Sequence, residues 1–195
     1  LNLVSKSLPI FLLSAHFGMT EIGLYSMGLL LAHTPINVAC GSLYKIMFRF
    51  VSEKVWNGEK ILPVIKKYIA SVLMVGIPSF ALLFFILPDL TAIILGDEWR
   101  ISGEYIRLML PWLLAFAVFN VLDFLPELFK KQEGLFYFEI ITLILRTSAL
   151  IVGIYLSNIY LAIALYFLVC FIMQASGSIW LVFMAKSYDK GKLKP

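Results

Sequence analysis

Apolar residues in this chain come in long runs, and the polar residues gather in short stretches between the runs. Six runs can be separated, and they cover about 3–17, 22–48, 68–87, 106–129, 135–156 and 159–185. A helix of about 20 apolar residues crosses the hydrocarbon core of a bilayer, and backbone groups in lipid must bond within their own segment. The predicted fold is therefore all-α, a polytopic membrane protein with six transmembrane helices in one lobe.

The first run is short. The chain begins within an apolar stretch, and its first residue is Leu and not Met. We therefore expect the sequence to be part of a longer protein whose upstream residues complete the first span. Within the other runs, Pro35 should kink the second helix, and Pro126 should bend the fourth, since proline removes a backbone donor. Ser157 and Asn158 form a minimal turn between the last two runs.

The main polar interruption is the stretch Pro88–Trp112, which separates three runs from the following three. It holds four acidic residues and two arginines. We predict a loop at the water interface there, containing a brief interfacial helix over Leu90–Leu95. Gly96 should end that helix, because glycine tolerates the positive φ of a helix C′ position.

Composition supports a membrane protein. The sequence is 61% hydrophobic and 14% charged, with a mean hydropathy of +0.92, whereas soluble domains are about 45–50% apolar and about 25% charged. Cys40 and Cys170 lie inside apolar runs, so we expect small buried hydrophobic residues rather than a disulfide or a metal pair. No catalytic or nucleotide-binding motif is present, so the sequence predicts no enzyme, no catalytic or metal-ligating residue and no cofactor.

Basic residues predict the orientation. With the N-terminus inside, thirteen lysines and arginines fall on the cytoplasmic side and two, Arg100 and Arg107, fall outside. By the positive-inside rule, both ends of the chain should be cytoplasmic. The net charge of +4 is thus a topology signal, and we expect no nucleic-acid partner. The thirteen are Lys6, Lys45, Arg49, Lys54, Lys60, Lys66, Lys67, Lys130, Lys131, Lys186, Lys190, Lys192 and Lys194.

Three features carry a family resemblance. One is the sequence IGLYS at the start of the second run (residues 22–26), followed by Pro35. Another is LGDEWR (residues 95–100), followed by Tyr105 and by LPW (residues 110–112). The last is the basic segment that closes the second run, with Ser52 and Glu53. Together they resemble the C-terminal half of bacterial polysaccharide and O-antigen flippases of the multidrug/oligosaccharidyl-lipid/polysaccharide exporter superfamily. Arg49 departs from the family, where a proline often follows the aromatic pair.

The resemblance implies a two-lobe transporter in the bacterial cytoplasmic (inner) membrane, of which this chain forms one lobe. The implied substrate is an oligosaccharide on a polyprenyl pyrophosphate, moved between leaflets for surface polysaccharide, such as lipopolysaccharide O-antigen, biosynthesis. The implied partners are this lipid-linked oligosaccharide, the lipid bilayer, the missing N-terminal lobe, and polysaccharide polymerase and assembly proteins. In transporters built from such repeats, the substrate site lies at the repeat interface.

Arg146 is the leading candidate site residue, because it lies near the middle of the fifth run, where an arginine costs roughly 2.5–3.5 kcal/mol. It could contact a carrier phosphate, or it could pair with Asp123 on the fourth run. Asn120 and Asp123 share one helical face with Glu127, for which a position at the membrane boundary is the simpler interpretation.

Two further candidates, His33 and Asn37, are four residues apart on the second run. They could bind sugar hydroxyls or a cation, or they could form an interhelical hydrogen bond. Glu139 lies two turns before Arg146, near the cytoplasmic interface, where it could simply be solvated. Gln174, Ser176 and Ser178 are interpreted as polar groups of helix packing.

Two other functions remain open. An ion-coupled small-molecule antiporter of the same superfamily would show a more apolar cavity with an essential acid, whereas a flippase should show a wide, cationic one. A non-transporting scaffold of a polysaccharide assembly complex would pair all its polar residues and have no open cavity.

Overall fold

The computed structural model describes residues 2–193, and residues 2–7 by their backbone alone. Every regular element in this range is helical, so the all-α fold is confirmed. The elements are α1 (Asn2–Ser14), α2 (Met19–Trp56), α3 (Leu62–Leu95), the 3-10 helix η1 (Asp97–Trp99), α4 (Arg100–Leu122), α5 (Leu125–Leu128), α6 (Gln132–Tyr155) and α7 (Ile159–Asp189).

Five segments of the described chain are long and apolar enough to span a membrane: α2, α3, the segment from η1 through α5, α6 and α7. The chain is thus a multi-pass membrane protein. Helix α1 has 13 residues, about 20 Å at 1.5 Å per residue, and this is short of the hydrocarbon core. The sixth span therefore stays a prediction.

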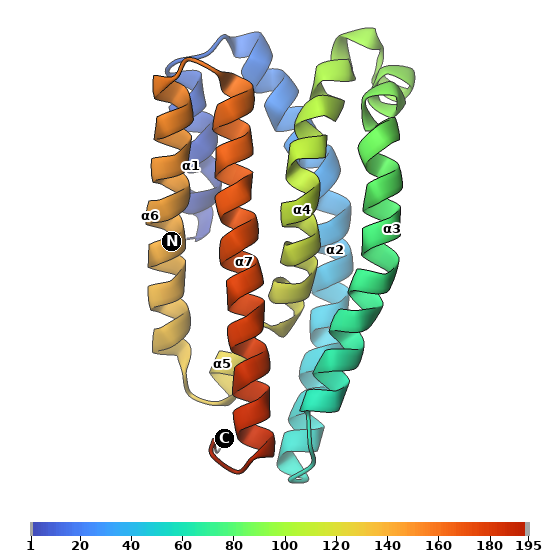
Figure 1. Ribbon diagram of the computed structural model, residues 1–195, viewed down its shortest axis with the longest axis vertical. Helices are drawn as coiled ribbons and strands as arrows, with labels where there is room; N and C mark the ends of the chain where they lie inside the picture. Colours follow the sequence, from blue (N-terminus) through green and yellow to red (C-terminus); the bar gives the residue numbers. More distant parts are fainter. Residues whose placement is uncertain (1, 194–195) are drawn as a thin grey trace.

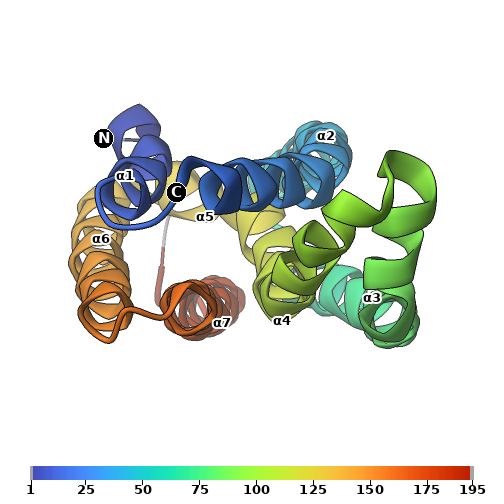
Figure 2. The same cartoon turned by 90° about the horizontal axis from the view of Figure 1, so that it is seen from above.

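Helix α4 is the centre of the bundle. It packs on α2, α3 and α7, while α6 packs on α7, and α1 touches α2 and α6. Thirteen of its 23 residues are buried, whereas α3, at the edge of the lobe, buries five of 34. Figure 2 shows α1, α2, α4, α7 and α6 arranged around a common interior, with α3 outside it. This interior contains the candidate site described below.

Helix α2 bends between its two halves. Its first half runs obliquely across the bundle, and its second half runs along the bundle axis (Figures 1 and 2). Pro35 is the proline within this helix, and a proline inside a helix removes one hydrogen bond and clashes with the preceding turn. The predicted kink of the second span is confirmed.

The loop predicted over Pro88–Trp112 is wrong for most of its length. Helix α3 continues through Pro88 to Leu95, and α4 begins at Arg100. Leu90–Leu95 is thus the end of α3, not a separate interfacial helix. Gly96 does end the helix, with φ +105°. The polar residues gave a false loop signal because they lie on helical turns that extend beyond the apolar layer.

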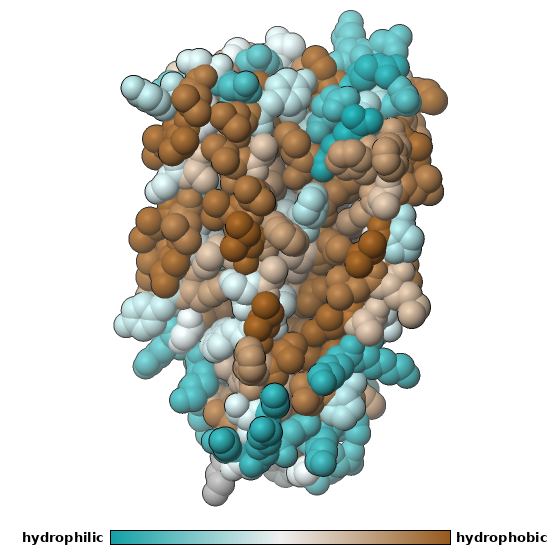
Figure 3. All heavy atoms as spheres, in the orientation of Figure 1, coloured by the Kyte–Doolittle hydropathy of each residue, from teal (hydrophilic) through white to brown (hydrophobic). Residues whose placement is uncertain are grey.

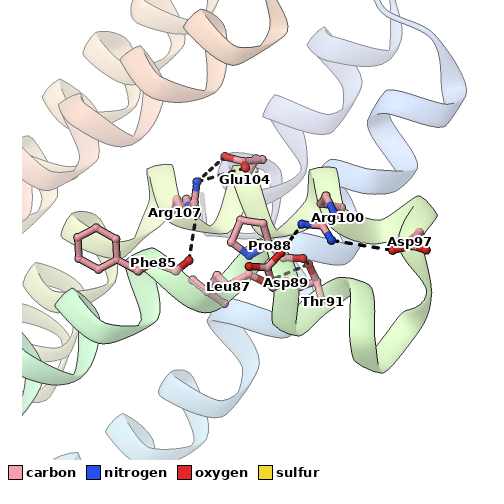
Figure 4. Close-up of polar contacts among 9 residues, drawn as sticks. All are labelled: Phe85, Leu87, Pro88, Asp89, Thr91, Asp97, Arg100, Glu104 and Arg107. Carbon is pink, nitrogen blue, oxygen red and sulfur yellow. Dashed lines mark hydrogen bonds and ion pairs between the residues drawn. The ribbon is translucent and has the colours of Figure 1, made fainter.

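These polar residues pair between and along α3 and α4 (Figure 4). Arg107 Nη1 bonds both Glu104 carboxylate oxygens at 3.1 and 3.2 Å, and Nη2 donates to the Phe85 carbonyl at 3.2 Å. Arg100 pairs with Asp89. Both arginines therefore fix the α3–α4 hairpin, a structural role that explains why they lie at this end of the molecule.

Two glycines let helices approach closely. A Cβ on Gly103 would lie 2.5 Å from Pro88 Cα, and a Cβ on Gly153 would lie 2.2 Å from Ala162 Cα. The first contact joins α3 to α4, and the second joins α6 to α7. Because both obstacles are backbone atoms, neither pair of helices could accept a side chain here without separating.

Charge is segregated along the bundle. Figure 3 shows an apolar belt between two polar ends. The α2–α3 connection, the α5–α6 connection and the end of α7 meet at one end, here called the lysine-rich end. The predicted gathering of basic residues at one end is confirmed, although Lys6 and Lys194 lie outside the described side chains. Which side of the membrane this end faces stays a prediction. The described basic residues toward this end are Lys45, Arg49, Lys54, Lys60, Lys66, Lys67, Lys130, Lys131, Lys186, Lys190 and Lys192. Lys45 and Arg49 lie within α2, about three and two turns before its last residue, Trp56.

Candidate functional site

A cavity of about 220 Å³ lies inside the bundle, lined from α1, α2, α4, α6 and α7. All the candidate site residues of the sequence line it, so the structure brings together side chains that are up to 113 residues apart in the chain (146 − 33). The candidates in its wall are His33, Asn37, Asn120, Asp123 and Arg146.

Each helix contributes one face to the cavity. On α2 the lining residues recur every four residues, from Tyr25 through Leu29 to His33 and Asn37. This spacing places side chains above one another on one face of a helix. The same spacing appears on α4 and on α7. The lining residues of α4 with its C-cap are Trp112, Phe116, Phe119, Asn120 and Asp123, and those of α7 are Tyr166, Phe167, Cys170 and Gln174.

Aromatic rings from α2, α4 and α7 contact one another and form an aromatic wall in the cavity. The Trp112 ring stacks on His33, with ring centroids 5.7 Å apart and planes inclined by 9°. It also packs against Phe167 at 4.9 Å and Phe116 at 5.6 Å. Such ring pairs add to the burial energy and hold one another in a defined orientation. The wall is therefore rigid, and it offers flat apolar surface beside polar groups.

Charged and amide groups form a second, polar part of the cavity wall. Asp123 caps the C-terminus of α4, and Glu139 and Arg146 lie two turns apart on α6. The two carboxylates are close enough to interact electrostatically, and Arg146 lies near Cys170 and Tyr166 on α7. The Gln174 Oε1 atom is buried and has no hydrogen-bond partner among the described residues. The wall thus combines one guanidinium, two carboxylates and three amides.

Arg146 and Asp123 do not form the ion pair that was one of the two predicted arrangements. No ion pair among the described residues joins them, although both line the cavity. Asp123 is the C-cap of α4 and Arg146 lies in α6, and these two helices touch through the rings of Phe119 and Phe138, whose centroids are 5.6 Å apart. Arg146 therefore lines the cavity without a direct ion pair to a described carboxylate.

Asp123 lies in the cavity wall at a break between two helices. Helix α4 ends at Leu122 and the short helix α5 starts at Leu125, with Pro126 in its first turn. The predicted bend at Pro126 is confirmed, and it takes the form of a full interruption. Glu127 lies beyond the break, is exposed and does not line the cavity. The simpler interpretation of Glu127, as a boundary residue, fits this position.

Sequence reasoning missed several lining residues. Gln174 was assigned to helix packing, and the aromatic wall was not foreseen. Glu139 is exposed, as expected of a solvated residue, and it also lines the cavity. A signal existed: Tyr166, Cys170 and Gln174 recur at a spacing of four on α7, as His33 and Asn37 do on α2. Helical periodicity alone does not distinguish a face towards a cavity from a face towards a packed neighbour.

Two apolar pockets lie elsewhere. One of about 300 Å³ lies between α2, α3 and α4, and one of about 450 Å³ lies against α3, α4 and α7. Thr91 is the one polar residue in the first, and its hydroxyl is already bonded to the carbonyls of Leu87 and Pro88 at 3.1 and 3.0 Å. Neither pocket offers polar groups that would orient a ligand.

Comparison with known proteins gives a match over the first half of the chain. The family described as "Polysaccharide biosynthesis protein" matches residues 1–103, which is 103 of 195 residues. The match covers α1 to α3, η1 and the first turn of α4. No curated protein and no solved structure matches the chain.

Proposed function

The chain belongs to the polysaccharide biosynthesis protein family, and on that premise we propose that it is one lobe of a lipid-linked oligosaccharide flippase. The substrate is an oligosaccharide unit on a polyprenyl pyrophosphate, moved across the bacterial cytoplasmic membrane for surface polysaccharide biosynthesis. The N-terminal lobe, absent from this sequence, would complete the transport cavity. The lipid bilayer is the solvent, and polysaccharide polymerase and assembly proteins would take up the product.

The observation that carries this proposal is the cavity, which joins an aromatic wall to a polar wall inside a membrane-embedded bundle. Polar groups within membrane spans are costly and mark substrate or ion pathways. A sugar ring has apolar C–H faces that suit Trp112 and Phe116, and hydroxyls that suit Asn37 and Asn120, whose amides both donate and accept. At about 220 Å³, the cavity has room for about one sugar ring and not for a whole oligosaccharide.

Charge favours the sugar over the pyrophosphate as the group that enters this lobe. The wall carries Arg146 against Asp123 and Glu139, so it is not the cationic lining expected of a flippase. Two carboxylates would repel a pyrophosphate, while carboxylates and a guanidinium both bond sugar hydroxyls. Arg146 then acts on the glycan. We assign no carrier phosphate to it.

The two carboxylates also support the alternative function, an ion-coupled small-molecule antiporter. An acid that gains and loses a proton or a cation within a cavity could couple transport to an ion gradient. The open polar cavity gives less support to a non-transporting scaffold, in which the polar residues would be paired with one another.

A matched set of variants in the full-length protein tests the proposal. Glu139→Gln and Arg146→Ala change the cavity wall, whereas Glu133, in the first turn of the same helix, does not line the cavity, so Glu133→Gln is the control. Arg49→Ala, whose side chain is 83% exposed, is the arginine control. Loss of one charged hydrogen bond should lower translocation about tenfold or more.

The assay is translocation of a lipid-linked oligosaccharide in proteoliposomes, beside complementation of surface polysaccharide at equal protein level. Both controls should retain full activity. Normal activity in Glu139→Gln and Arg146→Ala would remove the cavity from the transport path. Export of a small molecule without translocation of the lipid would instead support the antiporter.

A further inference from the structure

The last residue of α7 caps the first turn of α3. Asp189 Oδ1 accepts the backbone N–H of Ile61 at 2.9 Å, and Oδ2 accepts that of Leu62 at 3.1 Å. The first amides of a helix have no partner within the helix, and a carboxylate there also meets the positive end of the helix dipole. A contact between residues 128 positions apart thereby joins the end of α7 to the α2–α3 connection.

A second contact lies beside the first. The Tyr188 hydroxyl donates to the Val55 carbonyl at 3.2 Å, and the Tyr188 ring packs on Phe129 at 5.2 Å. Val55, Phe129 and Ile61 are buried, with 7%, 2% and 0% of their surface exposed. We name this group the clasp: Tyr188 and Asp189 with their acceptor and donor groups on Val55, Ile61 and Leu62.

The clasp closes the lysine-rich end of the bundle below the cavity. On α7 the cavity lining ends at Gln174, fifteen residues before Asp189 (189 − 174), or about 22 Å. Apolar side chains fill the space between them and belong to one buried cluster. Opening this end along α7 requires this part of α7 to separate from that cluster. The cluster members between the cavity and the clasp include Phe124, Leu125, Leu181, Met184 and Ala185.

Helix α7 has a weak point between the cavity and the clasp. Ser176 and Ser178 bond back to the carbonyls of Met173 and Gln174, at 2.7 and 2.8 Å, and Gly177 lies between them. Back-bonding serines bend helices, glycine weakens a helix interior, and kinks gather at Gly/Ser pairs. Helix α7 is unbroken here, and Gly177 packs closely against Phe119 and Phe138. By its residue types, Ser176–Ser178 is the segment of α7 next to the cavity where a bend costs least.

We propose that the clasp is a latch: when Asp189 releases the α3 N-terminus, α7 pivots at Ser176–Ser178 and opens the cavity to the lysine-rich end. The cavity itself is the site of the proposed function, and the latch gates it whatever the transported molecule is. The contact suits a latch because it is small. The two hydrogen bonds to the carboxylate can break and re-form in each cycle, and the pivot then also withdraws Leu181, Met184 and Ala185 from the buried cluster.

The reactivity of Cys170 towards a thiol reagent reports the opening directly. It lines the cavity and is 4% exposed, whereas the other cysteine, Cys40, lies outside the cavity. In full-length protein with Cys40→Ala, a membrane-impermeant methanethiosulfonate reagent is applied from each side of sealed vesicles. Asp189→Ala should increase Cys170 labelling about tenfold or more, from the lysine-rich side only. Asp189→Asn keeps one acceptor oxygen and should give a smaller increase.

The control is Asp97→Ala, an aspartate with a 95% exposed side chain at the opposite end, which should leave labelling unchanged. A latch held shut by a disulfide between Leu62→Cys and Asp189→Cys should suppress Cys170 labelling and transport, and a reductant should restore both. Unchanged labelling in Asp189→Ala, or equal labelling from both sides, would overturn the latch. If Cys170 labelling depends on Asp189 as expected but the protein translocates no oligosaccharide, the latch would be supported and the flippase function would be refuted.

Discussion

Gly153→Ala should separate α6 from α7 and destabilise the lobe. The added Cβ would lie 2.2 Å from Ala162 Cα, 2.6 Å from its nitrogen and 2.7 Å from its Cβ. Carbon atoms pack at about 3.5–4.0 Å, so the helices must part by about 1.3 Å (3.5 − 2.2). The obstacle is the backbone of α7, and no change of rotamer relieves it. Neighbouring buried side chains, Leu150 and Ile163 among them, would lose contact as well.

The magnitude follows from the geometry. A gap of 0.5–1 Å already forfeits a quarter to a half of a van der Waals contact, and overpacked sites lose about 1–3 kcal/mol. Alanine returns up to about 1 kcal/mol through its higher helix propensity. We expect a net loss of about 2 kcal/mol. For a chain of this size that corresponds to a melting temperature lower by about 4–8 °C.

Gly41→Ala is the matched control, because a Cβ at Gly41 meets nothing within 4 Å. The same change of residue in a helix interior should leave stability equal or slightly higher there. The assay is the loss of the monodisperse peak in size-exclusion chromatography after heating detergent-purified protein. A melting temperature for Gly153→Ala equal to that of Gly41→Ala would refute the close α6–α7 packing on which the shape of the cavity depends.

Three further predictions concern charge, topology and the second lobe. Arg146→Ala and Asp123→Asn should each retain normal protein level in immunoblots of membranes, because no ion pair joins them; a double mutant that restores the level of two depleted singles would contradict this. Cysteines at Asp97→Cys and Lys190→Cys should react with impermeant reagents from opposite sides, Asp97→Cys from outside; the reverse pattern would overturn the positive-inside orientation. Residues 1–195 alone, reconstituted in vesicles, should translocate no lipid-linked oligosaccharide above background, and clear activity would end the two-lobe hypothesis.

The sequence by itself determined that this is a helical membrane protein. Apolar runs of spanning length leave the backbone no other way to satisfy its hydrogen bonds in lipid. The prolines were local signals of the same kind, because Pro35 and Pro126 act on their own turn whatever surrounds them. The cost of an arginine in a span likewise sufficed to indicate that Arg146 faces an interior cavity.

Local sequence patterns failed where contacts from a neighbouring helix stabilise a helical turn. Pro88 and the acids after it suggested a loop, yet α3 continues through them, since Gly103 of α4 packs against Pro88 and Arg107 bonds the Phe85 carbonyl. These contacts come from the neighbouring helix. Amphipathic spacing and hydropathy describe one segment at a time, so they did not reveal that the partner helix stabilises these turns.

Only the tertiary structure decided which polar faces meet. Gln174 and Glu139 gained a place in the cavity wall, and Arg146 and Asp123 proved to share that wall without pairing. The clasp is a further case, because Asp189 and Ile61 are joined across 128 positions of sequence. The physical reason is common to all of them. A sequence fixes the direction in which a side chain leaves its own helix, whereas the partner it meets depends on helix crossings set by the whole bundle.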